Sequence, residues 1–526
     1  MRIFIALLTV GGLFLAAVAG AGAATKPVTF VVDGATTKPI SPYIYGFNFP
    51  DWRKQKCVTL CRWGGNRTTA YNWETNASNA GNDWHYQNDD YLSRSDAPAD
   101  PVLKMVQAAQ AAGAASIVTV PCAGYVSADK NGDGDVNKTP DYIHKRFVIS
   151  LPRKGAPPAD KPDLTDAKVY QDEFVHFIEA ACPRARKDPA RTVFYALDNE
   201  PDLWSSTHAR IHPKPTTYEE LVKVNTDYAL AIKAVAPKAM VFGFASYGWG
   251  GFTTLQNAPD AKGRDFLEFY LAQMRQAEKR AGKRLIDAVD LHWYPEAQGG
   301  GVRITEDDSG PAVAAARVQA PRSLWDPTYT EDSWITRDSL HQPIRLIPRV
   351  LAKIEKNYPG TKLALAEYYY GGGAHISGTL AEADALGIFG REGVFAAALW
   401  HCGQTDDKFI HAAFAMYRDY DGKGGTFGET SLAARTDDVE NTSVYASKDA
   451  RGNVVVVAIN KSGQATPVSL KLKNCPAGKR VAVFRLTSAG ASPAPDKDLA
   501  VAGGAIAAEL PAQSVSTLVI EPPAKK

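Results

Sequence analysis

Eight short β-type runs, separated by longer helical stretches, constrain the fold more than any other feature of this sequence. The runs are Ile44–Asn48, Thr59–Trp63, Ala115–Pro121, Thr192–Leu197, Met240–Ala245, Ala288–Trp293, Leu363–Glu367 and Val394–Trp400. Several are nearly continuous apolar segments, as expected of parallel strands that helices cover on their outer side. They predict an α/β fold, a (β/α)8 TIM barrel over residues 43–424. A doubly wound open sheet is the alternative, because a strand count does not show closure.

The intervening segments have the local signals of helices. Residues Tyr218–Val235 place apolar side chains on one stripe, and Thr217 with Glu220 forms a capping-box pattern at the start of that segment. Pro101–Ala112 and Val169–Ala181 also have helical patterns, and each precedes a predicted strand. This alternation of strand and helix supports the barrel.

The sequence changes character after about Gly425. Short β-rich runs separated by Gly, Pro, Ser and Asn turns predict a small antiparallel β-sandwich over residues 425–526. The runs are Ser443–Ser447, Asn453–Asn460, Val468–Leu472, Arg480–Leu486 and Ser514–Ile520. Val28–Val32 is β-patterned as well, so we expect residues 24–42 to contribute a strand to the sandwich.

Residues 1–23 have the pattern of an export signal. Arg2 precedes the apolar run Ile3–Val18, and the small residues Ala21-Gly22-Ala23 suit a cleavage site. The apolar run is short for a transmembrane anchor. We therefore expect a secreted protein, extracellular or periplasmic and outside any membrane.

The charge balance limits the partners that we expect, and the cysteine content limits the disulfide bonds. The 59 basic and 57 acidic residues nearly cancel, so we expect no nucleic acid partner. A neutral polymer suits this balance as substrate, and we expect the protein to be a monomer. Six cysteines are too few for a disulfide-built scaffold. Cys57 and Cys61 could form one local bridge, and buried free thiols are the alternative.

The chemistry is expected at the carboxyl ends of the barrel strands, which form the active face of such a fold. Glu200 follows the fourth predicted strand and Glu367 ends the seventh. Two glutamates at one barrel mouth suit the cleavage of a glycosidic bond. One protonates the leaving oxygen, and the other attacks the anomeric carbon or activates water. Strand placement alone leaves open that each merely pairs with a basic neighbour.

Longer motifs surround both glutamates. They are Arg62-Trp63-Gly64-Gly65-Asn66-Arg67, Leu197-Asp198-Asn199-Glu200-Pro201, Asp290-Leu291-His292-Trp293-Tyr294-Pro295-Glu296 and Glu367-Tyr368-Tyr369-Tyr370-Gly371-Gly372-Gly373. In this order, from about Tyr43 to Tyr417, the sequence resembles glycoside hydrolase family 44. Tyr369 departs from the family pattern, which has asparagine at this position.

The resemblance implies a retaining enzyme with Glu200 as acid/base and Glu367 as nucleophile, without a catalytic cofactor. It also implies endo-hydrolysis of β-1,4-glucans, including carboxymethylcellulose and often xyloglucan. A xyloglucan-specific or xylan-active endohydrolase and a non-catalytic carbohydrate-binding barrel are the alternatives. A serine hydrolase is disfavoured because Phe244-Ala245-Ser246-Tyr247-Gly248 lacks the first glycine of G-x-S-x-G.

Four neighbours of the glutamates are candidate substrate-binding or positioning residues. Asn199 could donate to the sugar 2-hydroxyl. Arg62 could hold Glu367 ionised through its opposite charge, or serve only as a buried ion pair. His292 and Tyr294 share a face of the sixth strand and could orient either glutamate, or pack at the rim of the core.

Three tryptophans are candidate sugar-stacking residues, because indole faces suit the apolar faces of glucose rings. Trp400 ends the eighth predicted strand, and Trp325 and Trp334 lie in the long segment after the sixth. Packing in the core is the alternative for each of them.

The segment Asp129–Asp135 has the D-x-N-x-D-G-D spacing of the first half of a calcium loop. Asp129, Asn131, Asp133 and Asp135 are its candidate ligands. Because the twelfth position is Pro140 and not Glu, a complete EF-hand is not expected. A structural calcium ion and a solvated acidic turn are the two interpretations.

Overall fold

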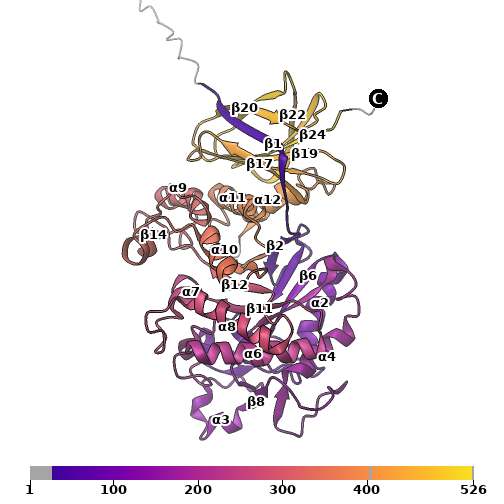
Figure 1. Ribbon diagram of the computed structural model, residues 1–526, viewed down its shortest axis with the longest axis vertical. Helices are drawn as coiled ribbons and strands as arrows, with labels where there is room; N and C mark the ends of the chain where they lie inside the picture. Colours follow the sequence, from indigo (N-terminus) through magenta and orange to yellow (C-terminus); the bar gives the residue numbers. More distant parts are fainter. Residues whose placement is uncertain (1–25, 402–405, 524–526) are drawn as a thin grey trace, which may run out of the picture.

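The computed structural model describes residues 26–401 and 406–523. The export signal expected at residues 1–23 lies outside the described residues. The chain forms two bodies, a barrel and an all-β domain above it in the view of Figure 1.

The predicted barrel is confirmed. Eight parallel strands close in the order β10-β11-β12-β15-β16-β2-β3-β6, which excludes the open sheet. Their bounds are β2 Tyr43–Asn48, β3 Leu60–Trp63, β6 Ala115–Val120, β10 Val193–Leu197, β11 Val241–Ser246, β12 Ala288–Trp293, β15 Lys362–Tyr368 and β16 Ala396–Leu399. Each corresponds to one of the eight predicted runs.

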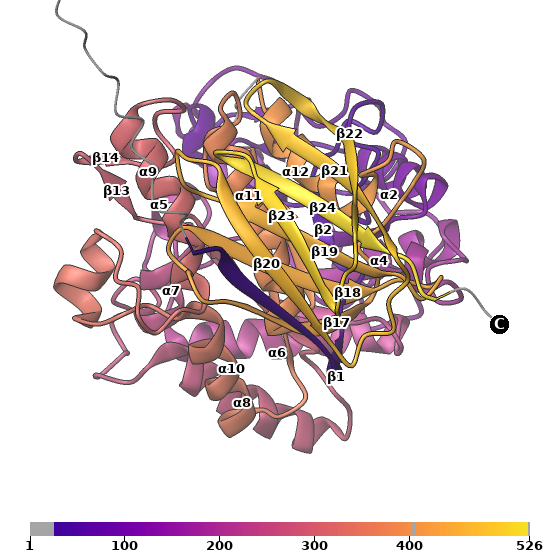
Figure 2. The same ribbon diagram turned by 90° about the horizontal axis from the view of Figure 1, so that it is seen from above.

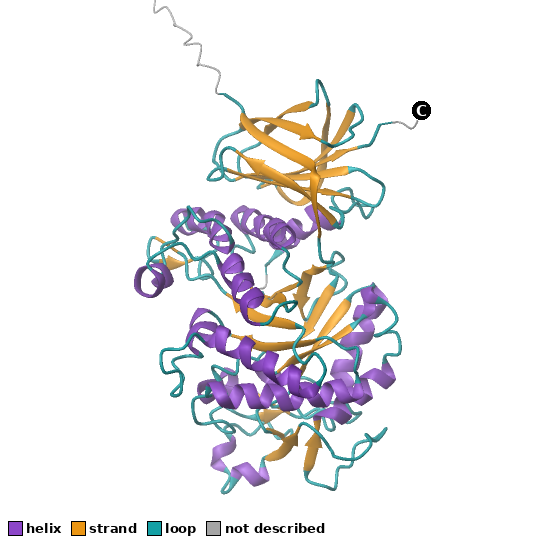
Figure 3. Ribbon diagram, viewed as in Figure 1, coloured by secondary structure: helices purple, strands orange, loops and turns teal. Residues whose placement is uncertain are grey.

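Helices cover the outer side of the barrel (Figure 3). They are α2 Asp100–Ala112, α4 Gln171–Ala181, α6 Tyr218–Val235, α8 Phe266–Ala281, α10 Leu346–Asn357, α11 Ile376–Glu392 and α12 Lys408–Arg418. The capping box predicted at the start of α6 is present, with both of its hydrogen bonds. Among the connections described, the one between β2 and β3 contains neither helix nor strand.

Shorter elements lie in the connections between the barrel strands. They are α1 Asn66–Thr69, β4 Ser78–Asn79, η1 Gly81–Trp84, β5 Asn88–Asp89, β7 Tyr125–Ser127, η2 Val136–Lys138, α3 Tyr142–Lys145, β8 Phe147–Leu151, β9 Lys168–Tyr170, η3 Pro189–Arg191, α5 Trp204–Thr207, α7 Trp249–Thr254, β13 Gln298–Gly299, β14 Val302–Arg303, α9 Pro311–Gln319, η4 Ala320–Leu324 and η5 Ile335–Leu340.

Side-chain alternation along the strands divides the barrel core into two layers. Inward residues fill the barrel interior, with the rings of Tyr43, Phe194 and Phe242 beside alanines such as Ala364 and Ala366. Outward residues such as Leu365 pack beneath the helices. The interior is therefore a packed core, and chemistry is confined to the mouth.

The C-terminal domain is one nine-stranded sheet in the order β22-β21-β24-β19-β18-β17-β1-β20-β23. Its strands are β1 Val28–Pro39, β17 Thr430–Thr436, β18 Thr442–Lys448, β19 Val454–Asn460, β20 Thr466–Lys473, β21 Arg480–Thr487, β22 Gly490–Ala500, β23 Ala505–Leu510 and β24 Ser514–Ile520. The ends of the sheet meet, because β22 and β24 both contact β23. The sheet thus folds over a core of its own, which includes Phe30, Val456 and Leu518.

The N-terminal strand joins this domain, as predicted. β1 pairs antiparallel with β17 and parallel with β20, and Figure 2 shows it in indigo among the yellow strands. The predicted antiparallel domain is confirmed, and β1 with β20 forms a parallel pair within it. β1 enters from a distant part of the chain, so no hairpin fixes its direction relative to β20.

Three strands of this domain were not predicted. β22 contains Pro493 and Pro495 with charged residues, a composition found on edge strands, and it does form an edge of the sheet. β23 is alanine-rich and lies at the other edge. β17 has weak strand character and is held by its pairing with β1.

The two bodies are joined through helices α11 and α12, which contact the sheet. Lys461 of the sheet domain lies 2.7 Å from Asp384 of α11, and both side chains are buried. Tyr445 donates a hydrogen bond to the other oxygen of Asp384 (2.5 Å). A buried charge pair of this kind fixes the contact, since separating the partners would leave an uncompensated charge.

Two further predictions from the sequence concern a disulfide bond and membrane-spanning segments. Cys57 and Cys61 are free thiols, so the local disulfide does not form. Within the described residues, every helix is too short or too polar to span a membrane.

Candidate active site

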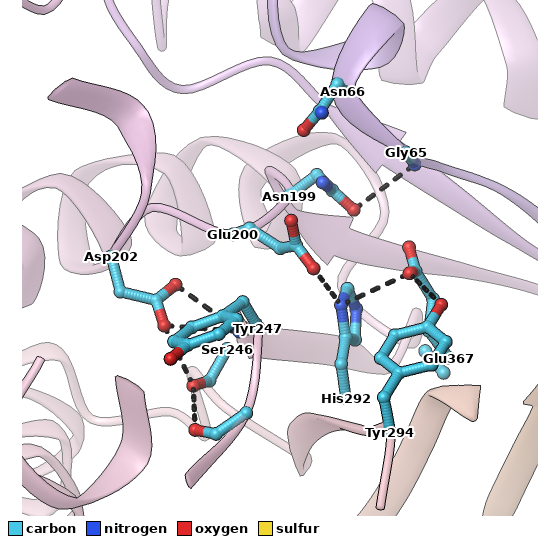
Figure 4. Close-up of polar contacts among 12 residues, drawn as sticks. Gly65, Asn66, Asn199, Glu200, Asp202, Ser246, Tyr247, His292, Tyr294 and Glu367 are labelled. Atoms are coloured by element: carbon cyan, nitrogen blue, oxygen red, sulfur yellow. Dashed lines mark hydrogen bonds and ion pairs between the residues drawn. The ribbon is translucent and has the colours of Figure 1, made fainter. Parts of the chain in front are cut away.

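Glu200 and Glu367 lie at the carboxyl end of the barrel, with His292 between them (Figure 4). Nδ1 of His292 lies 2.8 Å from Oε1 of Glu200 and 3.4 Å from Oε2 of Glu367. Tyr294 donates a hydrogen bond to the same Glu367 oxygen (2.7 Å). Strands β10, β12 and β15 thus bring these four predicted residues together.

Arg62, on β3, is fully buried beneath this group. Its guanidinium donates to Glu367 Oε1 (2.6 Å), Asn199 Oδ1 (2.8 Å) and Asn48 Oδ1 (3.1 Å). The amide of Gly65 also donates to the Asn199 oxygen (3.2 Å). Because these contacts orient the Asn199 amide group, its NH2 is left as a donor for a ligand.

The turn that carries Glu200 departs from regular strand geometry. Asp198 and Glu200 have φ angles of 62° and 43°, in the left-handed region that side chains disfavour. The buried Asp198 carboxylate accepts hydrogen bonds from Thr69 and from the backbone of Cys122 and Asn199. Strain held by such contacts is typical of residues positioned for function.

The environments of the two glutamates push their pKa values apart. Burial raises the pKa of Glu200, with the negative charge of Glu367 adding to it. Burial also acts on Glu367, but the charges of His292 and Arg62 and the hydrogen bond from Tyr294 outweigh it and lower its pKa. A protonated Glu200 opposite an ionised Glu367 is the division of roles that acid and nucleophile need.

Another buried carboxyl group, that of Asp202, lies close to Glu200. Burial and the charge of Glu200 raise the pKa of Asp202 to about 7. Its carboxylate accepts hydrogen bonds from the Ser246 hydroxyl (3.2 Å) and the Tyr247 amide (3.2 Å).

Glu200, His292 and Glu367 are also the group within the described residues whose ligand atoms could surround a metal ion. One such atom from each lies within 4.8 Å of the others. His292 contacts both glutamates, and the guanidinium of Arg62 is adjacent. These contacts account for the closeness of the three groups, so we assign no metal to them.

A cleft of about 720 Å³ opens next to the catalytic group. Asn48, Gly65 and Trp400 line the inner part of the cleft. Trp400 therefore lies at the barrel mouth, as its position at a strand end predicted. The outer part is lined by exposed aromatic rings that the sequence did not single out, because their loop has no strand-end signal. Trp84 is 56% exposed and Tyr91 is 72% exposed.

The exposed ring of Tyr91 is supported on one face. The Arg67 guanidinium lies 4.1 Å from its centroid, and Asp89 holds Arg67 through a 2.6 Å ion pair. One face of the ring is therefore occupied by a cation. The other is a flat apolar surface at the edge of the cleft.

The other two predicted tryptophans do not line this cleft. Trp325 is half-buried, with the guanidinium of Arg391 4.0 Å from its ring at the end of α11. Trp334 precedes η5 and packs against the barrel core. The structure therefore gives both a packing position and does not bring them to the catalytic group.

The predicted calcium loop has arginine partners. Asp129 and Asp133 both pair with Arg146, and Asp135 pairs with Arg210. Asn131 donates its backbone amide to Asp129 (3.1 Å). The carboxylates that a calcium ion would need are thus engaged, and this donor set does not fit the ion as arranged. The calcium site stays a prediction.

Comparison with known proteins identifies the family. Residues 77–297 match the model of glycoside hydrolase family 44. A Paenibacillus polymyxa xyloglucanase of that family, solved with xyloglucan, is 40% identical, with a TM-score of 0.89 over 94% of this chain and 100% of that one. The chain belongs to glycoside hydrolase family 44.

Two curated relatives are similarly close to this family 44 chain. An endoglucanase A from Paenibacillus lautus is 44% identical over 84% of the chain. A beta-mannanase/endoglucanase A from Caldicellulosiruptor saccharolyticus is 44% identical over 85% of it. The chain spans 65% and 35% of the lengths of these two relatives.

The tyrosines that follow Glu367 in the family 44 motif are buried. Tyr368 donates its hydroxyl to Glu382 of α11 (2.6 Å). Tyr369, the departure from the family pattern, is fully buried. The glutamate itself keeps its contacts with Arg62, His292 and Tyr294.

Proposed function

We propose that this chain is a retaining endo-β-1,4-glucanase. One observation carries the proposal: an oxygen of Glu200 and an oxygen of Glu367 lie within 4.8 Å of each other. Carboxyl groups about 5–5.5 Å apart belong to enzymes that retain anomeric configuration, whereas inverting enzymes separate them by about 6.5–9.5 Å.

In the first step, the ionised Glu367 attacks the anomeric carbon and forms a covalent ester. The bond from that carbon to the leaving sugar oxygen breaks as Glu200 transfers its proton to that oxygen. Arg62 and Tyr294 orient the attacking carboxylate. The NH2 of Asn199 donates to the sugar 2-hydroxyl, a contact that strengthens toward the transition state.

In the second step, Glu200 takes a proton from water as the water oxygen attacks the anomeric carbon. The ester bond to Glu367 breaks, and both carboxyl groups return to their starting states. Consumption of the Glu367 charge in the first step lowers the pKa of Glu200, which suits its change from acid to base. These two carboxyl groups supply the nucleophile and the proton, so we propose that no cofactor takes part.

The substrate class follows from the cleft. Its aromatic lining by Trp400, Trp84 and Tyr91 suits a chain of several pyranose rings, and its open outer end suits cleavage within a polymer. The relatives named for endoglucanase and xyloglucanase activity favour unbranched β-1,4-glucan and xyloglucan as substrates. We further propose that the protein acts outside the cell, which the apolar N-terminal run Ile3–Val18 supports, and that it acts as a monomer.

A panel of carboxymethylcellulose, xyloglucan, xylan and mannan tests this function. We expect hydrolysis of the glucans, with a rapid fall in viscosity as the mark of internal cleavage. Glu367→Gln should abolish it, and Glu200→Ala should lose polymer hydrolysis but still react with substrates whose leaving group needs no proton. Full activity in Glu367→Gln, or initial release of the inverted anomer observed by NMR, would refute the mechanism.

A further inference from the structure

The strand that carries Glu367 contains one residue more than either neighbouring strand at the same level. The register pairs on its two sides are Asp290–Ala364 and His292–Glu367 against β12, and Leu365–Ala397 and Tyr368–Leu399 against β16. On each side, three steps along β15 match two steps along the neighbour. β15 therefore contains a β-bulge centred on Ala366.

The bulge decides the direction in which Glu367 points. Side chains alternate along a strand, and Ala366 faces the barrel interior whereas Leu365 faces the helices. Unbroken alternation would send Glu367 outward. The extra residue instead turns Glu367 toward Arg62 in the mouth. Tyr368 then takes the outward position and bonds to α11.

Two buried side chains form hydrogen bonds with the backbone amide and carbonyl of Ala366. Asp290 accepts the Ala366 amide hydrogen through Oδ1 (3.0 Å), and Asn48 donates from Nδ2 to the Ala366 carbonyl (2.9 Å). A bulged residue loses its place in the ladder, and buried backbone groups must find other partners. Asp290 approaches from β12, and Asn48 approaches from the end of β2.

We propose that Asp290 and Asn48 form a side-chain clamp on Ala366 that positions the nucleophile Glu367. The expected kinetic effects of this clamp rest on the proposed function. Its geometry is independent of that function. Asn48 also accepts a hydrogen bond from Arg62 (3.1 Å), which in turn donates to Glu367 (2.6 Å). The same amide thus fixes the backbone before the nucleophile and the cation beside it.

The chemistry of Asp290 supports a role beyond stability. It is fully buried, and its second oxygen has no hydrogen-bond partner among the described residues. Burying a carboxylate for one backbone hydrogen bond is an expensive way to stabilise a strand. The charges of His292, Arg62 and Glu367 all act on this carboxyl group, so it lies beside the proposed catalytic site.

Asp290→Ala tests the clamp, and Asp287→Ala is its matched control. Asp287 precedes the same strand at the opposite end of the barrel, where its carboxylate also accepts a backbone amide, that of Val241 (2.8 Å). Both variants lose a carboxylate and a bond to the neighbouring strand, and Asp287→Ala also loses the ion pair with Lys233 (2.8 Å). We expect each to lower Tm, but only Asp290→Ala to lower kcat, by about 100-fold, the effect of a nucleophile misplaced by about 1 Å.

KM should change little, and the rate of covalent inactivation by a 2-fluoro glycoside should fall in parallel with kcat. Asp290→Asn keeps an acceptor oxygen for Ala366, so we expect it to recover most of the kcat. Equal kcat in Asp290→Ala, Asp287→Ala and wild type would overturn the clamp. Absence of glucan hydrolysis by the wild type would instead count against the proposed function.

A crystal structure of Asp290→Ala decides the geometry independently of activity. We expect the Ala366 bulge to relax and the Glu367 carboxylate to leave Arg62. An unchanged Glu367 in that structure would refute the clamp. Asn48→Ala provides the second variant, with the same expected displacement from the carbonyl side.

Discussion

Nη1 of Arg62 donates to Oε1 of Glu367 across 2.6 Å, and both side chains are buried at the mouth of the barrel. The residues lie 305 positions apart in the sequence. The guanidinium charge is one of the reasons that the pKa of Glu367 is lowered.

Arg62→Gln should therefore raise the pKa of Glu367. The acid limb of the pH profile of kcat/KM, where the nucleophile loses its proton, should move to higher pH. Loss of one partner from a buried ion pair should also cost about 3–5 kcal/mol in the free energy of unfolding. Hydrolysis rates measured from pH 4 to 9 test the first effect, and an acid limb that stays in place would contradict it.

Gly64→Ala should lower the activity of the enzyme. A Cβ at this position would overlap the guanidinium of Arg62, and that side chain is fully buried. We expect kcat to fall by about 100-fold, as for other small displacements of catalytic groups. Gly463→Ala, where a Cβ meets no atom within 4 Å, is the control and should retain full activity.

Tyr91→Ala should weaken binding of long substrates only. The ring supported by Arg67 lies in the outer part of the cleft, away from the glutamates, so it can contact only sugars distant from the cleaved bond. We expect KM for the polymer to rise roughly tenfold, which corresponds to about 1.4 kcal/mol. Oligosaccharides of increasing length should reveal a threshold, and an equal rise for the shortest substrate would contradict this position.

The free energy of unfolding should fall as pH rises from about 5 to about 8. Burial raises the pKa of Asp198 to about 6, of Asp202 and Glu331 to about 7, and of Glu382 to about 8. The folded state therefore keeps protons that the unfolded chain releases above about pH 4. This contribution is complete below the unfolded pKa values and is lost as pH rises through the folded ones.

Thermal melts across this range test the sign. Glu382→Gln keeps an acceptor for the Tyr368 hydroxyl but cannot ionise, so its decline in Tm toward pH 8 should be shallower than that of the wild type. A wild-type Tm that rises from pH 5 to 8 would contradict this prediction.

Chelation should leave the Tm unchanged. Arg146 and Arg210 already form ion pairs with Asp129, Asp133 and Asp135, so the loop needs no cation to hold these carboxylates together. Melts with EDTA and with added calcium measure this directly. A Tm that drops with EDTA and returns with calcium would support the ion suggested by the loop sequence.

Much of the fold was predictable from local patterns. Eight apolar runs marked the barrel strands because parallel strands are buried on both faces. The strand-end rule then located Glu200, Glu367, His292 and Trp400. The edge strand β22 was not predictable in this way, since its prolines and charges suit an exposed edge and not a buried run.

Hydrophobic periodicity is a local property of the chain, so the residues that end the barrel strands could be predicted from it. The contacts among those residues depend on long-range packing. Asp290 and Asn48 lie 76 and 318 positions from Ala366, so no local pattern reveals that both bind the same bulged residue. A bulge changes the direction of every later side chain in its strand, and strand pairing alone reveals it. Unbroken alternation would turn Glu367 outward, and the contacts that turn it toward the barrel mouth exist only after the barrel closes.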